Sequence, residues 1–189
     1  MKRLLDFCIA ACCLLLFSPL IVICWLTIKI GGGPAIYKQE RIGRNGKPFF
    51  IYKFRSMVVD AEIEGHELLQ QDNDPRLTRI GSFLRKHHLD ELPQLWNVLM
   101  GDMAFVGPRP ERKYYIDQIM ERDPRYERLY ALRPGVTSYA TLKNGYTDTI
   151  DKMLVRLEMD LYYLEHQSLW MDAKILWKTF TNIVSGRIF

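Results

Sequence analysis

The feature that most constrains this chain is a stretch of 22 residues without a charged side chain, from Phe7 to Ile28. As a helix it would be about 33 Å long, against a membrane hydrocarbon core of about 30 Å. No A-x-A cleavage motif follows it, and the run is long for the apolar core of a cleaved signal peptide. The stretch therefore predicts a segment that stays in a membrane.

Two features bear on whether this segment crosses the membrane or turns back within it. Ser18-Pro19 stands at its midpoint, where proline removes a helix hydrogen bond and forces a bend, while the serine hydroxyl can bond the freed carbonyl. Basic residues flank both ends: Lys2, Arg3, Lys29, Lys38, Arg41 and Arg44. Positive charge prefers the cytoplasmic side, which favours a re-entrant hairpin with both ends on one face. A kinked spanning helix remains the alternative, because spanning helices tolerate proline.

Composition separates this region from the rest of the chain. Residues 1–57 hold nine Lys or Arg against two acids, whereas residues 58–189 hold 17 against 20. All four cysteines, Cys8, Cys12, Cys13 and Cys24, lie in the apolar stretch. The remaining 165 residues therefore contain no disulfide framework, zinc thiolate or cysteine nucleophile, which fits a reducing, cytoplasmic setting.

Residue patterning after the membrane segment predicts a mostly helical α+β protein. Two runs rich in Ile, Tyr and Phe flank residues 43–46, and Asn45-Gly46 favours a β-hairpin turn between them. Helices are expected at 58–71, 80–87, 89–99, 111–121 and 125–132 and again from 150, with strand or loop at 101–110 and a turn at Pro134-Gly135. The aromatic residues Trp170, Trp177 and Phe180 suit either a core helix or one at a bilayer surface.

The segment HLDELPQLWNV, residues 88–98, sets two carboxylates, Asp90 and Glu91, just ahead of Pro93. Proline is tolerated in the first turn of a helix, so one of the two acids is expected at or next to the N-cap. Capping without catalysis is one explanation of the pair. The functional alternative is that the helix N-terminus keeps the aspartate ionised and attracts phosphate.

Basic side chains surround this acidic pair in the sequence: Lys53, Arg55, Arg85, Lys86, Arg109 and Arg112. Arginine binds phosphate oxygens in a bidentate manner, and a carboxylate can bring Mg²⁺ through its oxygens. Each basic residue singly is more often a solvated charge. Their clustering on either side of two acids predicts an anionic, phosphate-bearing ligand at a membrane face.

Several ordered motifs together resemble the bacterial sugar transferase family, the small monotopic polyprenyl-phosphate phosphoglycosyl transferases. They are Ser18-Pro19, GPAIYKQERIGRNGKPFFIYKFRSM, DPRLTRIGSFLRKHHLDELPQLWNVLMGDMAFVGPRP, RPGVT and DLYYLEHQSLWMDAKI. The resemblance covers nearly the whole chain. It implies a re-entrant membrane helix-break-helix over residues 1–30 with its break at Ser18 and Pro19, and a cytoplasmic catalytic domain over residues 31–189, built on a small β-hairpin and amphipathic interfacial helices and packed on the membrane face.

The resemblance also implies an activity. A sugar 1-phosphate would pass from a UDP-sugar to undecaprenyl phosphate, giving polyprenyl-diphosphate-sugar and UMP through a covalent phosphosugar-aspartyl intermediate. Asp90 matches the family's nucleophile, and Glu91 matches the second acid, with Mg²⁺ held at this pair. The phosphate-binding positions match Lys53, Arg55, Arg85, Arg109 and Arg112. The reaction would be the first membrane step of bacterial glycoconjugate assembly, such as a capsule, O-antigen, exopolysaccharide or glycoprotein.

The partners that this resemblance implies are a UDP-sugar, polyprenyl phosphate and membrane lipids, with Mg²⁺ as cofactor and no nucleic acid. The implied location is the inner membrane, with a monotopic anchor and the catalytic domain on the cytoplasmic face. Contacts with downstream glycosyltransferases and a homodimer are left open.

One stretch departs from the family pattern. Many members carry a Gly and then Trp-Ala-Gln after the PG-x-T turn, whereas this chain reads PGVTSYATLKNGYTDT, with Ser138, Tyr139 and Thr141. Contacts to sugar or uridine are therefore not transferred through this stretch.

Two rival functions remain at this point. A phosphatase acting on a phosphorylated lipid would need an acid for the leaving group, and the four histidines, His66, His87, His88 and His166, supply a single adjacent pair. We expect His87 and His88 to face solvent or to cap the preceding helix. A silent membrane scaffold that recruits partners through a basic face would not need two carboxylates among its arginines.

Overall fold

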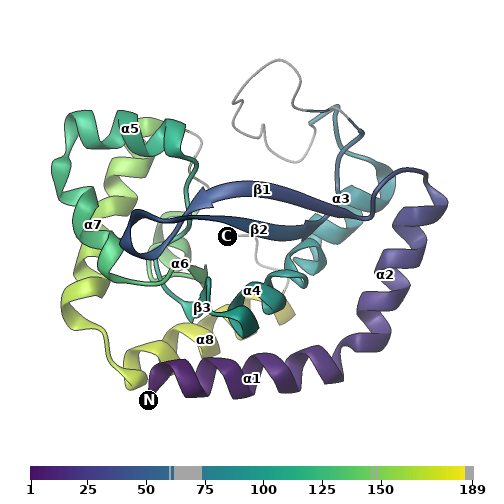
Figure 1. Cartoon of the computed structure of the whole chain (residues 1–189), viewed down its shortest axis with the longest axis horizontal. Coiled ribbons are helices and arrows are strands. Elements are labelled where there is room, and N and C mark those ends of the chain that lie inside the picture. The colour runs from purple at the N-terminus through teal and green to yellow at the C-terminus, as the bar shows by residue number, and fades with distance from the viewer. Residues whose placement is uncertain (60, 62–73, 146, 148, 186–189) are drawn as a thin grey trace.

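The computed structural model describes residues 1–59, 61, 74–145, 147 and 149–185 of the chain (Figure 1). A bent pair of helices runs along two edges of the view, and a β-hairpin crosses the middle with the other helices around it. Two small two-stranded sheets are the strand content of this part of the chain, which confirms the mostly helical α+β class.

The bent pair consists of α1 (Lys2–Leu16) and α2 (Ser18–Ile30), which meet at an angle of 62°. Neither helix is long and apolar enough by itself to cross a membrane, and no other helix in the described ranges is; the pair together has that length and composition.

Ser18 and Pro19 account for the bend. In a continuous helix the amide of residue 19 would bond the carbonyl of Leu15, but proline has no amide hydrogen. The Ser18 hydroxyl donates to that same Leu15 carbonyl oxygen at 2.8 Å. The backbone therefore breaks without leaving this carbonyl unpaired, as the sequence predicted for these two residues.

The hairpin agrees with the sequence prediction. Strands β1 (Ile36–Ile42) and β2 (Pro48–Phe54) pair antiparallel, from Ile36 opposite Phe54 to Ile42 opposite Pro48. The short helix η1 (Arg44–Gly46) forms the turn, where Asn45 and Gly46 have φ values of 59° and 69°. These left-handed angles are the reason for the Asn-Gly sequence at the tip.

The region around the acidic pair differs from its prediction. Helix α3 (Arg79–Lys86) lies where a short helix was expected, but the helix predicted over 89–99 is split into the turn η2 (Leu89–Glu91) and helix α4 (Gln94–Met100). Two features delay α4: His88 has a left-handed φ of 54°, and Pro93 lies directly before the helix. The helix expected over 58–71 lies mostly outside the described residues.

The second half of the chain adds a parallel pair and five helical segments. Strand β3 (Ala104–Val106) pairs with β4 (Gly135–Thr137), so the turn predicted at Pro134-Gly135 is wrong from Gly135 onward. The single-strand pattern is too short to reveal this pairing, because each strand has three residues. The helical segments are α5 (Lys113–Arg122), η3 (Pro124–Ala131), α6 (Thr141–Asn144), α7 (Ile150–His166) and α8 (Leu169–Val184).

Apolar clusters tie the bent pair to the domain. On α1, Ala10 is fully buried against Val98 of α4 and Met103. On α2, Cys24 and Ile28 are buried in a second cluster with residues of β2, α3 and η2. One side of each membrane-type helix is therefore part of the protein core.

The sequence of α8 suited either a core helix or a helix at a bilayer surface, and the exposure of its side chains bears on this choice. Ile175 is 3% exposed and packs in the core, whereas Trp170, Trp177 and Phe180 are 70%, 69% and 58% exposed. Core packing is therefore wrong for these three aromatic side chains. They form an exposed apolar face of α8.

We expect Pro19→Leu to restore the hydrogen bond from residue 19 to Leu15 and to straighten the bent pair. Spin labels at two exposed sites, Ile9 and Val22, should then move apart in detergent, as measured by electron–electron double resonance. Leu16→Ala, next to the bend but without a role in its hydrogen bonds, is the control. An unchanged distance in Pro19→Leu would mean that packing of α2, not proline, sets the bend.

Candidate active site

The two predicted acids lie in a turn, not at a helix cap. The N-cap of α4 is Pro93, with no side-chain hydrogen bond, and Asp90 and Glu91 belong to the preceding turn η2. Capping without catalysis is therefore wrong as an explanation of the pair. The left-handed His88 turns the chain sharply at the end of α3, which directs η2 toward the end of the hairpin.

The carboxylates are withdrawn from solvent and one of them is paired. Asp90 is 6% exposed. Lys53, from strand β2, donates to the Glu91 carboxylate at 2.6 Å, and the Glu91 side chain is 21% exposed. The pair thus joins the turn η2 to the open end of the hairpin.

The same surroundings act on the two acids in opposite directions. Burial raises the pKa of the Asp90 carboxyl, and neighbouring Glu91 adds to this, although Lys53 and Arg85 work against it. Burial also acts to raise the pKa of Glu91, but Lys53 and Arg109 outweigh it and lower the pKa to about 2. Glu91 is therefore a firmly ionised carboxylate beside an Asp90 whose ionised form is less favoured.

Helix α3 brings Arg85 to the pair. Thr78 caps this helix by accepting a hydrogen bond from the Gly81 amide at 2.9 Å. A side chain at Gly81 would lie 1.8 Å from the Ser56 carbonyl oxygen, so only glycine allows α3 to pack this closely on the segment after β2. The close packing positions Arg85, in the last turn of α3, where its charge lowers the pKa of Asp90.

Arg109 is carried by the proline-rich segment after β3, and a buried ion network fixes this segment. Glu111 is 4% exposed and forms ion pairs with Arg156 of α7 and with Arg41 of β1, the latter at 3.5 Å. Arg41 also donates to the Pro110 carbonyl at 3.2 Å. The segment is thus anchored on both sides, and the charge of Arg109 reaches Glu91.

The other two predicted phosphate-binding residues have contacts of their own. Arg55 donates to the Gly32 carbonyl and so fastens the glycine hinge after α2. Arg112 is the N-cap residue of α5, where its charge acts on Arg41 and Tyr115. The principal basic charges acting on the two carboxyls include Lys53, Arg85 and Arg109. Phosphate binding by Arg55 and Arg112 stays a prediction.

Sequence reasoning missed Asn97, which locks α4 against β2. It is fully buried, accepts a hydrogen bond from the Tyr52 amide at 3.1 Å and donates to the Phe50 carbonyl at 2.7 Å. These bonds fix the strand beside Lys53 relative to the helix that follows the acids. The sequence carried little signal for this role, because Asn97 falls about 200° around the helix from Leu95 and so on the side where a polar residue is expected to face solvent.

The acidic turn is also packed against the bent pair. Leu89 and Leu92, on either side of Asp90 and Glu91, contact the cluster that contains Cys24 and Ile28 of α2. The candidate site therefore lies directly beside the helix that returns from the bend.

The acids suit Mg²⁺, although they do not form a complete cage. In the part of the chain that the structure describes, no three His, Cys, Asp or Glu side chains are grouped to hold a metal. Mg²⁺ commonly uses one or two carboxylates and completes its shell with waters and substrate phosphates. Asp90 and Glu91 provide that kind of oxygen donor.

Comparison with known proteins places this architecture in a family. A family model described as bacterial sugar transferase matches residues 1–186. A UDP-N-acetylgalactosamine-undecaprenyl-phosphate N-acetylgalactosaminephosphotransferase of Aeromonas hydrophila is 40% identical over 186 residues, covering 98% of this chain and 44% of that protein. A UDP-glucose:undecaprenyl-phosphate glucose-1-phosphate transferase of Caulobacter vibrioides is 41% identical over 188 residues, covering 97% of this chain and 70% of that protein.

The chain belongs to the bacterial sugar transferase family. It spans 44% and 39% of the lengths of its relatives from Aeromonas hydrophila and Escherichia coli, respectively.

We expect Lys53→Met to raise the pKa of Asp90 further, because Lys53 is the largest influence that favours its ionised form. The ionised carboxylate loses a nearby positive charge, so protonation occurs at higher pH. The titration can be followed by carbon NMR of carboxyl-labelled aspartate, with Asp90→Asn identifying the signal. Lys47→Met, at the other end of β2, should leave it unchanged, and an unmoved signal in Lys53→Met would contradict the geometry.

We expect Asn97→Ala to lower the melting temperature by roughly 5 °C or more, because two partly buried backbone groups of β2 lose the partner that joins them to α4. Gln118→Ala is the matched control, since that amide makes one 3.3 Å bond to the carbonyl one turn back in its own helix. Equal melting temperatures for the two variants would show that Asn97 does not hold α4 to the hairpin.

Proposed function

We propose that this chain transfers a sugar 1-phosphate from a UDP-sugar to undecaprenyl phosphate, with Asp90 as nucleophile. The observation that carries the proposal is the buried Asp90–Glu91 turn, on which the charges of Lys53, Arg85 and Arg109 act. The names of the relatives support the same substrates, since they describe transfer of sugar phosphates to undecaprenyl phosphate.

The first step forms a bond between an Asp90 carboxylate oxygen and the β-phosphorus of the UDP-sugar. The bond from that phosphorus to the bridging oxygen breaks, and UMP leaves with the oxygen and the electron pair. Arg85 and Arg109 are placed to neutralise charge on the diphosphate as it divides. Mg²⁺, held by Asp90 and Glu91, would supply further charge neutralisation of the phosphate oxygens when bound.

In the second step a phosphate oxygen of undecaprenyl phosphate attacks the phosphorus of the aspartyl phosphate. The bond to Asp90 breaks, which regenerates the carboxylate and releases the diphosphate-linked sugar. The acceptor phosphate is largely deprotonated near neutral pH, so the step does not require a general base. This agrees with the low pKa of Glu91, which makes that carboxylate a weak base and suits it to metal binding or orientation.

The membrane arrangement follows from the two substrates, one soluble in water and the other confined to lipid. We infer that α1 and α2 enter one leaflet of the inner membrane and return, so that both ends of the pair lie on the cytoplasmic face with the catalytic domain. The 62° bend, the Ser18 hydrogen bond and the basic residues at both ends support this monotopic arrangement. The exposed aromatic residues of α8 would lie at the lipid surface beside the domain.

The rival functions are less well supported by these contacts. The His87 ring nitrogen pairs with the Phe83 carbonyl at 2.8 Å, as expected for a side chain that caps α3, and His166 pairs with the Tyr162 carbonyl at 2.9 Å. Two of the histidines that a phosphatase could use are thus committed to their own helices. A scaffold gains nothing from a buried Asp90 whose ionisation is disfavoured.

The test is UMP release by the protein in nanodiscs with Mg²⁺ and undecaprenyl phosphate, across a panel of UDP-sugars. We expect release with one or two sugars, and a loss of roughly a thousandfold or more in Asp90→Asn. Asp117→Asn, an exposed aspartate paired with Lys113, is the matched control and should retain activity. In the absence of acceptor, intact mass should increase by one sugar phosphate in the native protein and not in Asp90→Asn.

Substantial turnover in Asp90→Asn would remove that residue as nucleophile and favour direct transfer in a ternary complex. Silence of the folded native protein across the whole panel would leave the scaffold as the better explanation.

A further inference from the structure

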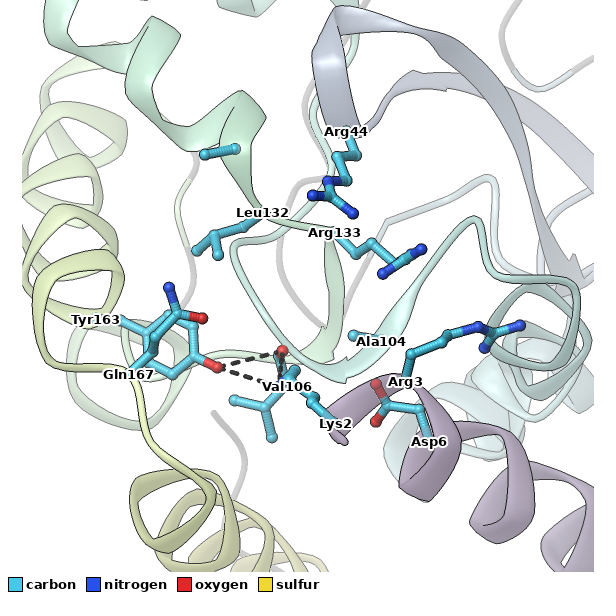
Figure 2. A pocket seen from close by; sticks show the side chains of 11 residues that line it. Lys2, Arg3, Asp6, Arg44, Ala104, Val106, Leu132, Arg133, Tyr163 and Gln167 are labelled. Carbon is cyan, nitrogen blue, oxygen red and sulfur yellow. Dashed lines mark hydrogen bonds between the residues drawn. The ribbon is translucent and has the colours of Figure 1, made fainter.

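A polar cavity lies near the tip of the hairpin, away from the acidic pair (Figure 2). Its volume is about 290 Å³, and Val106 and Leu132 are among its lining residues. Four cationic side chains line it, Lys2, Arg3, Arg44 and Arg133, against a single carboxylate, Asp6. The motifs GRNG and RPGVT, which the proposed reaction does not use, contribute two of the four.

Two of these cations are already used within the protein. Lys2 forms an ion pair with Asp172 and donates to the Val106 carbonyl at 3.0 Å. Arg3 donates to the carbonyls of Val98 and Leu99 in the last turn of α4, where a positive charge is favoured.

The other two retain unused donors. Arg133 uses its Nε to bond the Gly101 carbonyl at 2.9 Å, and its remaining guanidinium nitrogens make no hydrogen bond or ion pair within the described ranges. The Arg44 side chain likewise has no such partner among the residues that the structure describes. Figure 2 shows the two side chains near each other, Arg44 coming from the hairpin tip and Arg133 from the segment before β4, with the Arg133 guanidinium directed toward the side of Arg3.

The positive charges at this cavity repel one another. Burial lowers the pKa of Arg133, and the charges of Arg44 and Arg3 lower it further, while Asp6 opposes them. Arg44 is exposed and Arg133 is half-buried, so solvent screens part of this repulsion, and a bound anion would relieve the rest. A planar guanidinium with free N–H groups is suited to bind phosphate oxygens in pairs.

We propose that this cavity binds a phosphate group, with Arg44 and Arg133 as its donors. The size of the cavity fits a headgroup of a few atoms around the phosphorus. The residues that it would use belong to η1 and to the segment between η3 and β4, and none of them acts on Asp90 or Glu91.

The cavity is separate from the candidate active site. Arg44 is at the tip of the hairpin, and Lys53 is near its open end, with β2 extending between them from Pro48. Five residue steps of strand from Pro48 to Lys53 span roughly 17 Å, to which the turn adds further length. The phosphate in this cavity is therefore not the one that Asp90 attacks.

The residues around the cavity favour a membrane lipid as the source of this phosphate. The cavity is lined by Lys2 and Arg3 in the first turn of α1 and by Gln167 in the turn before α8, and the nearby α1 side chains Leu4 and Phe7 are 68% and 46% exposed. This combination of basic and aromatic residues is typical of the level of lipid headgroups. The assignment to a lipid rests on the membrane orientation in the proposed function, whereas the phosphate site itself does not.

The test measures melting temperature in detergent at constant ionic strength. The probes are dihexanoylphosphatidylglycerol, dihexanoylphosphatidylcholine and inorganic phosphate. We expect the anionic lipid to raise the melting temperature by roughly 5 °C at saturation. Arg44→Gln and Arg133→Gln should each abolish this rise. The control is Lys47→Gln, which removes an exposed positive charge next to the same hairpin turn and should leave the rise intact.

A second readout separates binding from a structural role. Without any added anion, Arg44→Gln should melt no lower than the native protein. The substitution removes the repulsion between Arg44 and Arg133, and among the described residues the Arg44 side chain has no hydrogen bond or ion pair to lose. A clear loss of stability in that variant would assign Arg44 a structural role and overturn the proposal.

The probes distinguish the sources. A rise that depends on both arginines with either lipid, and is weaker with inorganic phosphate, supports a lipid phosphate. A rise that inorganic phosphate produces equally, again through both arginines, supports the site and assigns it to a soluble phosphate. A rise that persists in both variants comes from elsewhere, including the Asp90 region, and overturns the proposal without bearing on UMP release.

Discussion

The return of α2 into the protein core is the constraint on which the rest of the site depends. A helix that simply continued from α1 would carry Cys24 and Ile28 away from the domain, yet both are buried against β2, α3 and the acidic turn. Their removal would expose Leu89 and Leu92, which flank Asp90 and Glu91. The break at Ser18-Pro19 is therefore a requirement for the packing of the turn that carries the two acids, as well as a feature of the apolar N-terminal segment.

The start of α1 is fixed by polar contacts in place of apolar ones. Lys2 pairs with Asp172 of α8, Arg3 binds the end of α4, and Asp6 accepts a hydrogen bond from the Phe105 amide at 3.3 Å. The start of α1 is thus attached by polar contacts to α8, α4 and β3, whereas α2 is attached by packing to the open end of the hairpin. Anchoring at both ends holds the apolar outer faces of the two helices in a defined orientation relative to the acidic turn.

Local patterns predicted the elements that are determined locally. The Asn45-Gly46 turn, the two hairpin strands and the break at Ser18-Pro19 each follow from the backbone preferences of a few residues. The error at the acidic pair had a different origin, since the helical spacing of leucines from 89 to 99 continues through Pro93, where the regular helix is interrupted. The pairing of β3 with β4 joins residues about thirty positions apart, which no short pattern specifies.

For the site residues too, local sequence predicted some features, and contacts between distant segments determined the others. Residue types alone predicted which charges could bind phosphate, but five basic positions looked equivalent in the sequence. Tertiary contacts separated them, because Arg55 is used at the Gly32 hinge while Arg85 is brought forward by the close approach that Gly81 allows. Asn97 and the Glu111 network were missed because their partners lie in distant segments, on β1, β2 and α7.

The adjacency of Asp90 and Glu91 gives the two acids different chemical properties. Lys53 bonds directly to Glu91 and influences Asp90 only through space, so Glu91 is stabilised as a carboxylate while its own charge disfavours ionisation of its neighbour. Two like charges on consecutive residues would ordinarily repel each other without benefit. Here one acid holds the lysine and the loop in place, and the other retains a carboxylate that is poorly stabilised by its surroundings. A poorly stabilised carboxylate gains more by forming a bond to phosphorus than a well-paired one, which agrees with the nucleophile's role that we propose for Asp90 and the orienting role that we propose for Glu91.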